Sequence, residues 1–330
     1  MTSATNITAD AVALQERDEF REAGWLKLIA PAKVNLHLAI GSRRPDGYHE
    51  AVSVMHALNL HDIVYARRIT DLGANGETGK SQPHVRMIGC GDVAAPDVAT
   101  ENNLAARAIV ALAETCDRPT RDKAIELRIE KNIPAQGGLG GGSTNAAATL
   151  VAAAHLWGLD PHDSRIEQTA RSLGADVPFF LHGGCSVYTG TGDTFVRALA
   201  PSKQAVALVK PEGGVSTAQA YRAFDEAPVA IPTQAVKNAQ EAHSATDIAP
   251  FNNLASAAES IMPELTEVRQ WMSSRLGENN VLLCGSGATT FGICDDFATA
   301  TSVVAQARKQ GWWARATSFG SARVMAVSTN

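Results

Sequence analysis

The chain has 330 residues, of which 45% are hydrophobic and 19% are charged, as in ordinary globular proteins rather than disordered or fibrous ones. The formal net charge is -5 and the pI is about 6.0, which excludes the global positive field that draws in nucleic acid or acidic lipid. We therefore expect neither nucleic acid nor a membrane as a partner, and any bound phosphate must be held by local groups. A chain of this length usually exceeds one hydrophobic core, so we expect two packed lobes.

The cysteines and the N-terminus indicate the compartment. The five cysteines are odd in number and scattered, and none forms a CxxC pair, which argues against a disulfide framework and against a zinc site. Residues 1–24 are acidic and lack a long apolar run, so we interpret them as a polar arm rather than a secretory signal. No apolar run approaches the ~20 residues of a membrane-spanning helix. We expect a cytoplasmic protein.

The first regular element that we predict is a strand over residues 34–40. Apolar residues alternate there with polar ones, which predicts one apolar face and an opposite face that carries Lys33, Asn35 and His37. Residues 41–47 are predicted to form a turn. Residues 51–68 again have an extended pattern, and the polar segment 70–84 is predicted to be an exposed connection.

Helices and strands then alternate along the chain. We predict a helix from Thr100 or Glu101 to about residue 114, a strand over 125–130, and helices over 145–157 and 163–173, the last one ended by Gly174. In the C-terminal third we predict strands over 204–210 and 281–284 and a helix over 263–276.

A glycine-rich loop connects the strand 125–130 to an alanine-rich helix. Five of the six residues 137–142 are glycine, so the backbone can approach an anion closely and direct several N–H groups toward it, while the helix adds the positive end of its dipole. The loop is neither a common P-loop nor a GxGxxG fingerprint. A flexible linker is the alternative, but linkers rarely join a strand to a helix directly. We predict that phosphate is bound by Pro134, Ala135, Gln136, Gly137, Gly138, Leu139, Gly140, Gly141, Gly142, Ser143 and Thr144.

If the phosphate bound by this loop is transferred to another molecule, the site needs two further groups. One orients or deprotonates the acceptor, and the other is a cation that offsets the charge that develops during transfer. Lys33, two residues before Asn35 on a strand, is the leading cation, although spacing alone fits a solvated lysine equally well. Asp176 precedes Val177-Pro178, so it fits either a catalytic carboxylate or the start of a short helix. A second glycine-rich segment, 283–292, fits either a ligand-covering loop or a tight turn.

Taken together, residues 31–36, the loop 137–144 and residues 285–288 with 291–292 resemble, in order, the three motifs of the GHMP kinase family. The resemblance implies a two-lobed α+β fold. Its N-terminal lobe, over residues 25–199, would bind ATP and resemble ribosomal protein S5 domain 2. Residues 200–330 would form a C-terminal α/β lobe, with the active site in the cleft.

The resemblance also implies roles for individual residues. Asp176 would be the catalytic base toward the acceptor hydroxyl, with Lys33 beside it and near the transferred phosphoryl group. ATP would be the co-substrate and Mg²⁺ is expected, with its protein ligands unknown. The acceptor would be contacted by Asn35, Gly285, Ser286 and Gly287.

Residues 44–49 and 173–179 resemble one branch of the family in particular. In that branch the acceptor is the 2-hydroxyl of a cytidine diphosphate derivative of methylerythritol, in the non-mevalonate route to isoprenoid precursors. Tyr48 would stack on the cytosine and His49 would hydrogen bond to it. The alternatives are a family member that acts on mevalonate, homoserine or a sugar, and a non-catalytic nucleotide-binding regulator.

Three features depart from the family pattern: one motif and the lengths of two segments. Asn252-Asn253-Leu254 stands where Asn-Asp-Leu is frequent, and the N-terminal arm and the 70–84 connection are longer than usual. None of these features includes a predicted catalytic residue. The expected assembly is a monomer or a homodimer.

Overall fold

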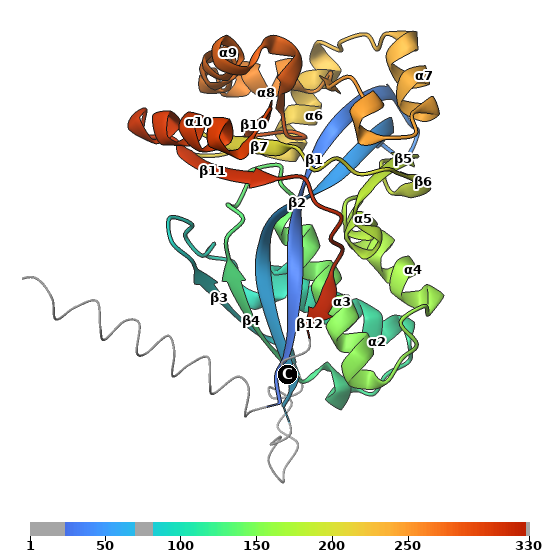
Figure 1. Cartoon of the computed structure of the whole chain (residues 1–330). Coiled ribbons are helices and arrows are strands. Elements are labelled where there is room, and N and C mark those ends of the chain that lie inside the picture. Colours follow the sequence, from blue (N-terminus) through green and yellow to red (C-terminus); the bar gives the residue numbers. More distant parts are fainter. Residues whose placement is uncertain (1–23, 70–81, 328–330) are drawn as a thin grey trace, which may run out of the picture.

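Two long antiparallel strands, β1 (Leu26–Arg43) and β2 (His49–Arg68), run through both lobes of the molecule (Figure 1). At about 3.3 Å per residue, such strands are roughly 60 Å long, which is why one pair can serve both lobes. The computed structural model describes residues 24–69 and 82–327. The predicted polar arm and most of the predicted 70–84 connection lie outside the described residues.

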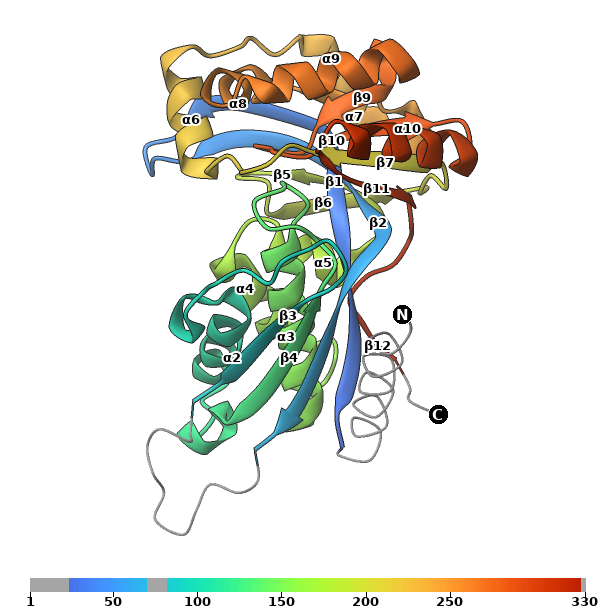
Figure 2. The ribbon, with the colours of Figure 1, turned by 90° about the vertical axis from the view of Figure 1, so that its left-hand side faces the viewer.

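The N-terminal lobe is a sheet with helices on one face (Figure 2). The strand order is β12-β1-β2-β4-β3, and β5 and β6 extend it through pairing of β5 with β2. Helices α2 to α5 pack on the sheet through a core rich in alanine and β-branched residues, so the helices lie close to the strands. The further elements of this lobe are β3 (His84–Gly89), α2 (Leu104–Thr115), β4 (Ile125–Lys131), α3 (Gly141–Trp157), α4 (Ser164–Leu173), α5 (Val177–His182), β5 (Cys185–Thr189), β6 (Thr194–Leu199) and β12 (Met325–Val327).

The C-terminal lobe is built on an antiparallel sheet of order β11-β7-β10-β9. One face packs against β1 and β2 through residues such as Leu58, Val206 and Phe291. The other face carries α9 and α10 (Figure 2). The elements are β7 (Ala205–Lys210), α6 (Thr217–Glu226), α7 (Thr233–Glu241), β8 (Phe251–Asn252), α8 (Ala255–Ile261), α9 (Glu264–Leu276), β9 (Val281–Leu283), β10 (Thr290–Cys294), α10 (Phe297–Lys309) and β11 (Trp313–Ser318).

The two-lobed α+β fold is confirmed, and most predicted elements are present within a residue or two of their expected ends. The strand predicted over 34–40 is longer and spans Leu26–Arg43, so the first residues of the turn predicted over 41–47 belong to β1. Two helix starts were also wrong. The helix expected from Thr100 or Glu101 begins at Leu104, because a short 3-10 turn precedes it and the Asn103 side chain accepts a hydrogen bond from the backbone N–H of Ala105. The helix expected from residue 145 begins at Gly141. The last part of the glycine-rich loop is therefore its first turn.

The prediction of a single polar face on the first strand was also wrong. Residues 30–40 are all buried, and the pairing of β1 with β2 shifts register between Pro31 and Lys33 and again between Asn35 and His37. A register shift changes which side chains share a face of the sheet. Lys33 and Asn35 line a pocket, whereas His37 packs on Phe251, with ring centroids 5.2 Å apart.

The division of the chain at residue 199 stays a prediction. The chain returns to the N-terminal lobe after β11, where β12 pairs with the beginning of β1. Across residues 24–69 and 82–327, no helix is both long and apolar enough to cross a bilayer.

Candidate active site

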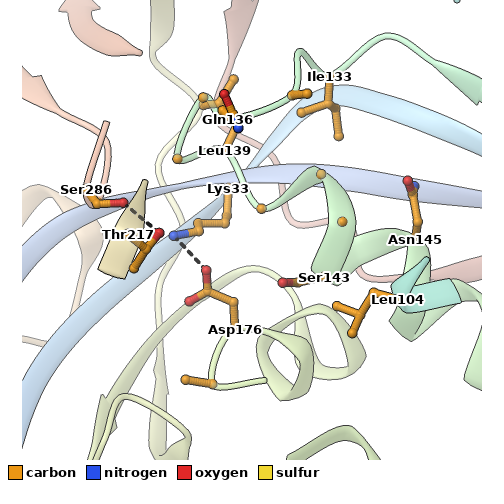
Figure 3. Close-up of a pocket in the computed structure, with 18 of the residues that line it drawn as sticks. Lys33, Leu104, Ile133, Gln136, Leu139, Ser143, Asn145, Asp176, Thr217 and Ser286 are labelled. Atoms are coloured by element: carbon orange, nitrogen blue, oxygen red, sulfur yellow. Dashed lines mark hydrogen bonds and ion pairs between the residues drawn. The ribbon is translucent and has the colours of Figure 1, made fainter. Parts of the chain in front are cut away.

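A cavity of about 600 Å³ is lined by residues of both lobes (Figure 3). It brings together most of the residues that the sequence predicted for the site, although they come from distant parts of the chain. Thr144, Tyr48, His49 and Gly287 do not line it. The predicted residues that do are Lys33, Asn35, Pro134, Ala135, Gln136, Gly137, Gly138, Leu139, Gly140, Gly141, Gly142, Ser143, Asp176, Gly285 and Ser286.

The glycine-rich loop is held by backbone hydrogen bonds from both sides. The N–H of Lys33 donates to the carbonyl of Leu139 at 3.0 Å, and the N–H of Ala288 donates to that of Gln136, also at 3.0 Å. Gly138 has φ +71°, and a Cβ there would overlap the carbonyl oxygen of Cys284. The second glycine-rich segment therefore packs directly on the first, a contact that only a residue without a side chain permits.

The loop ends in the N-terminus of α3. No side chain among the described residues caps this helix, and its first turn contains no acidic residue. The first-turn N–H groups and the positive end of the helix dipole are thus available to an anion. Gly140 has φ +74°, and a Cβ there would lie 2.5 Å from the ring of Phe180 and 3.1 Å from Cγ of Lys33. The loop therefore passes directly over Lys33.

Lys33 and Asp176 form an ion pair in the cavity, with Nζ 3.1 Å from Oδ2 (Figure 3). Lys33 is 3% exposed, so it is not a solvated strand lysine. Its Nζ also donates to Oδ1 of Asn35 at 2.8 Å, and Asn35 donates from Nδ2 to Oγ of Ser53 at 2.9 Å. Asp176 directly precedes α5 but makes no capping hydrogen bond. Its side chain is 36% exposed and lines the cavity, where it can meet a ligand.

Several lining residues were missed by the sequence reasoning. Lys131 and Asn145 line the cavity at the end of β4 and in α3, and Thr217 shares a 3.0 Å hydroxyl–hydroxyl hydrogen bond with Ser286. A signal for Lys131 was present, because it continues the buried face of a strand whose other buried members are apolar. Tyr221 also lines the cavity, and burial, with the charge of Asp176, raises its pKa to about 12.

Tyr48 and His49 lie beside the cavity's lining rather than in it. Tyr48 is 65% exposed, whereas His49 is 8% exposed. Both ring nitrogens of His49 have partners: Nδ1 is 3.0 Å from the carbonyl oxygen of Gly41, and Nε2 is 2.9 Å from Oδ1 of Asp225. The ring centroid of His49 is 5.5 Å from that of Tyr221. Tyr221 is therefore the physical link between His49 and the cavity.

The structure explains why asparagine suits position 253. The Oδ1 atom of Asn253 accepts from the N–H of Ile40 at 2.8 Å, and its Nδ2 donates to the carbonyls of Ile40 at 2.9 Å and Val229 at 3.0 Å. An ionised aspartate has no donor for these two carbonyls. The side-chain amide of Asn253 therefore has hydrogen-bond partners for both its oxygen and its nitrogen, so this departure from the family pattern fits the local structure.

All five cysteines are free thiols, as their spacing predicted. Cys284 is nearest to the site, and burial raises its pKa to about 12 although the charge of Lys33 lowers it. Burial thus disfavours the thiolate form of Cys284. Among the described residues, no three His, Cys, Asp or Glu side chains gather as a metal site.

Comparison with known proteins agrees with this geometry. The model of the GHMP kinases N terminal domain matches residues 103–184, and that of the GHMP kinases C terminal domain matches residues 234–311. A 4-diphosphocytidyl-2-C-methyl-D-erythritol kinase of Desulfitobacterium hafniense is 34% identical over 87% of this chain and 93% of its own. One of Bacillus velezensis is 36% identical over 80% and 86%. The chain belongs to the GHMP kinase family of ATP-dependent small-molecule kinases.

Solved structures give the same fold. A crystal structure of 4-(cytidine 5'-diphospho)-2C-methyl-D-erythritol kinase superposes with a TM-score of 0.68 at 31% identity and covers 89% of this chain and 99% of that one. A homoserine kinase from Cytophaga hutchinsonii has a TM-score of 0.64 at 18% identity over 92% and 97%, which shows a common fold alone.

Proposed function

We propose that this chain transfers the γ-phosphate of ATP to the 2-hydroxyl of 4-diphosphocytidyl-2-C-methyl-D-erythritol, in the non-mevalonate pathway of isoprenoid precursor biosynthesis. The observation that carries the proposal is the Lys33–Asp176 ion pair, which lies in one cavity with the uncapped N-terminus of α3. A base, a cation and an anion site are thus within reach of one acceptor. The relatives named above support the choice of acceptor.

In the proposed reaction, Asp176 accepts the proton of the acceptor hydroxyl as its oxygen attacks the γ-phosphorus and the bond to the β–γ bridging oxygen breaks, so that ADP leaves. Lys33 orients the Asp176 carboxylate and supplies positive charge close to the transferred group. Asn35 helps to hold Lys33 in place, because its Oδ1 accepts a hydrogen bond from Nζ at 2.8 Å. The acceptor would lie against Asn35, Gly285 and Ser286, with Gly287 shaping the turn.

The phosphates of ATP would be held by residues 134–144, chiefly through backbone N–H groups. Ser143 would add its hydroxyl, which faces the cavity, whereas Thr144 is buried and does not line the cavity. Mg²⁺ would be bound mainly by phosphate oxygens and water, as is usual at nucleotide sites, and Ser143 would add its hydroxyl. Asp176 would stay free to act as the base, and the ion would neutralise charge on the phosphates.

The cytosine would bind next to Tyr48 and His49, and Tyr221 connects His49 to the cavity. Tyr48 offers an exposed aromatic ring on which a base can stack. Because both ring nitrogens of His49 are occupied, its hydrogen bond to the base would use the backbone unless the ring moves. The working form would be a monomer or homodimer in the cytoplasm, with neither nucleic acid nor membrane as a partner, and the lobe boundary would fall near residue 199.

The test is ADP release by the purified protein with Mg²⁺ and ATP. The acceptors are the cytidylated methylerythritol, uncytidylated methylerythritol phosphate, mevalonate, homoserine and galactose. Turnover with the first compound alone is the expected result. Turnover with another acceptor would keep the kinase and overturn the acceptor. No turnover with any compound, with ATP still bound, would favour the non-catalytic regulator.

A further inference from the structure

A buried carboxylate on β2 lies at the entrance of the phosphate loop. Asp62 has no exposed surface, and its Oδ1 accepts hydrogen bonds from the backbone N–H groups of Asn132 at 2.7 Å and Ile133 at 2.9 Å. These two residues directly precede Pro134, where the loop begins. Hydrogen bonds to a charged, water-excluded acceptor are strong and directional. Asp62 thereby fixes the path of the backbone into the loop.

The second oxygen of the same carboxylate reaches the other end of the loop. Asp62 Oδ2 accepts from Nδ2 of Asn145 in α3 at 2.9 Å and forms an ion pair with Lys131. Lys131 closes the triangle, because its Nζ donates to Oδ1 of Asn145 at 2.9 Å. Lys131 and Asn145 are 3% and 2% exposed and both line the cavity. The contacts of Asp62 thus tie residues before the loop to a residue just after it.

We propose that Asp62 is a positioning residue that holds both ends of the phosphate loop and thereby sets the affinity for the nucleotide. It does not line the cavity, so it acts through the backbone and through Lys131 and Asn145. The inference rests on the proposed role of residues 134–144 in binding ATP. A purely structural ion pair would stabilise the lobe without distinguishing nucleotide from acceptor, whereas a positioning role affects the nucleotide selectively.

The first test is Asp62→Asn in the full chain. The amide keeps the shape but places an NH₂ group against Lys131 and Asn145, so donors face donors. We expect Kd for ADP with Mg²⁺ and KM for ATP to rise at least tenfold, about 1.4 kcal/mol, while KM for the acceptor stays within twofold. Equal changes in both KM values, or a fall in kcat alone, would overturn the proposal.

A matched control lies on the same two strands. Glu126 on β4 pairs with Arg67 on β2, with Oε2 and Nε 2.8 Å apart, away from the loop and outside the cavity lining. Glu126→Gln removes an ion pair between these strands, and we expect it to leave Kd for ADP within twofold. If Glu126→Gln weakened ADP binding as much as Asp62→Asn does, the effect would come from the pairing of the two strands, and the proposal would fail.

A double variant keeps the test decisive if Asp62→Asn does not fold. Replacing a buried ion pair by uncharged residues is often neutral for stability, so D62L/K131M leaves no unpaired buried charge. D62N/K131M is its reference, because it also lacks Lys131, which lines the cavity, but keeps an amide oxygen for the N–H groups of Asn132 and Ile133. We expect D62L/K131M to bind ADP at least tenfold more weakly than D62N/K131M. Equal affinities would overturn the proposal.

Measurements on the wild-type protein distinguish a failure of this inference from a failure of the proposed function. If it binds ADP but phosphorylates none of the five acceptors, the proposed reaction fails while the role of Asp62 is still decided by the variants. If it binds no ADP, the loop is not a nucleotide site and the role of Asp62 fails with it.

Discussion

Substituting alanine for Gly138 tests whether the backbone of the glycine-rich loop is the phosphate cradle. The residue has φ +71°, which costs an L-residue about 1–2 kcal/mol. The new Cβ would overlap the carbonyl oxygen of Cys284 and lie 3.0 Å from that of Gly287, and backbone atoms cannot rotate away as a side chain can. Overpacking of this kind adds about 1–3 kcal/mol. We therefore expect Gly138→Ala to destabilise the protein by about 2–5 kcal/mol.

The same substitution should also damage function. Relief of the overlap requires the loop to move away from the 285–288 segment by about 1 Å, and displacements of that size can cost about 10²-fold in rate. Denaturant unfolding measures the first effect, and ADP release and ADP binding measure the second. Gly142→Ala is the stability control, because its Cβ meets nothing within 4 Å, so the free energy of unfolding should not fall. A Gly138→Ala protein with wild-type ADP affinity would refute the claim that the backbone of the glycine-rich loop holds the phosphates.

Three further predictions follow from the site and the core. Asp176→Asn should leave ATP binding nearly intact and lower kcat by at least about 10²-fold, measured as ADP release; unchanged turnover would remove its assignment as the base. Tyr48→Ala should raise KM for the cytidylated acceptor at least about tenfold and leave KM for ATP within about twofold, since a stacked ring contributes mainly to binding of the cytosine. Equal effects on the two KM values would show that Tyr48 does not contact the cytosine selectively. His56 donates to the carbonyl of Ala57 and accepts from the N–H of Ser202, and burial lowers its pKa from 6.5 to about 4. The neutral form is therefore favoured by folding, and about 3 kcal/mol of stability, full above pH 6.5, should be lost as the pH falls toward 4. Unfolding curves at several pH values check this, and a His56→Gln protein with the same pH slope would contradict it.

Local patterns predicted the elements that depend on neighbours in sequence. The strand over 125–130 and the helix over 163–173 were found because apolar residues recur at the period of the element and because Gly174 ends the helix. The helix from Leu104 was placed too early, because Asn103 competes as a cap and its effect depends on the 3-10 turn before it. Boundaries of this kind depend on hydrogen bonds that periodicity does not record.

The faces of β1 could not be predicted, because its register shifts, including those at residues 31–33 and 35–37, arise from pairing with β2 and change the alternation on which the prediction depended. The same limit applied to the site. Lys33 and Asp176 were ambiguous by spacing, and only the resemblance to a family gave them roles; their 3.1 Å separation is a property of two elements that are distant in sequence. Asp62 gave no signal at all, since an acidic residue in a strand is usually at the surface.

The sequence by itself determined most helices and strands and the position of the phosphate loop, because glycine content and periodicity act over a few neighbouring residues. Its resemblance to a family added the class of fold and the residues that the chemistry needs. Tertiary structure alone decided which of those residues meet. The burial of Lys33, the open N-terminus of α3 and the contacts of Asp62 with both ends of the loop result from packing β1, β2, β4 and α3 together. Such contacts depend on register and burial, which no local pattern encodes.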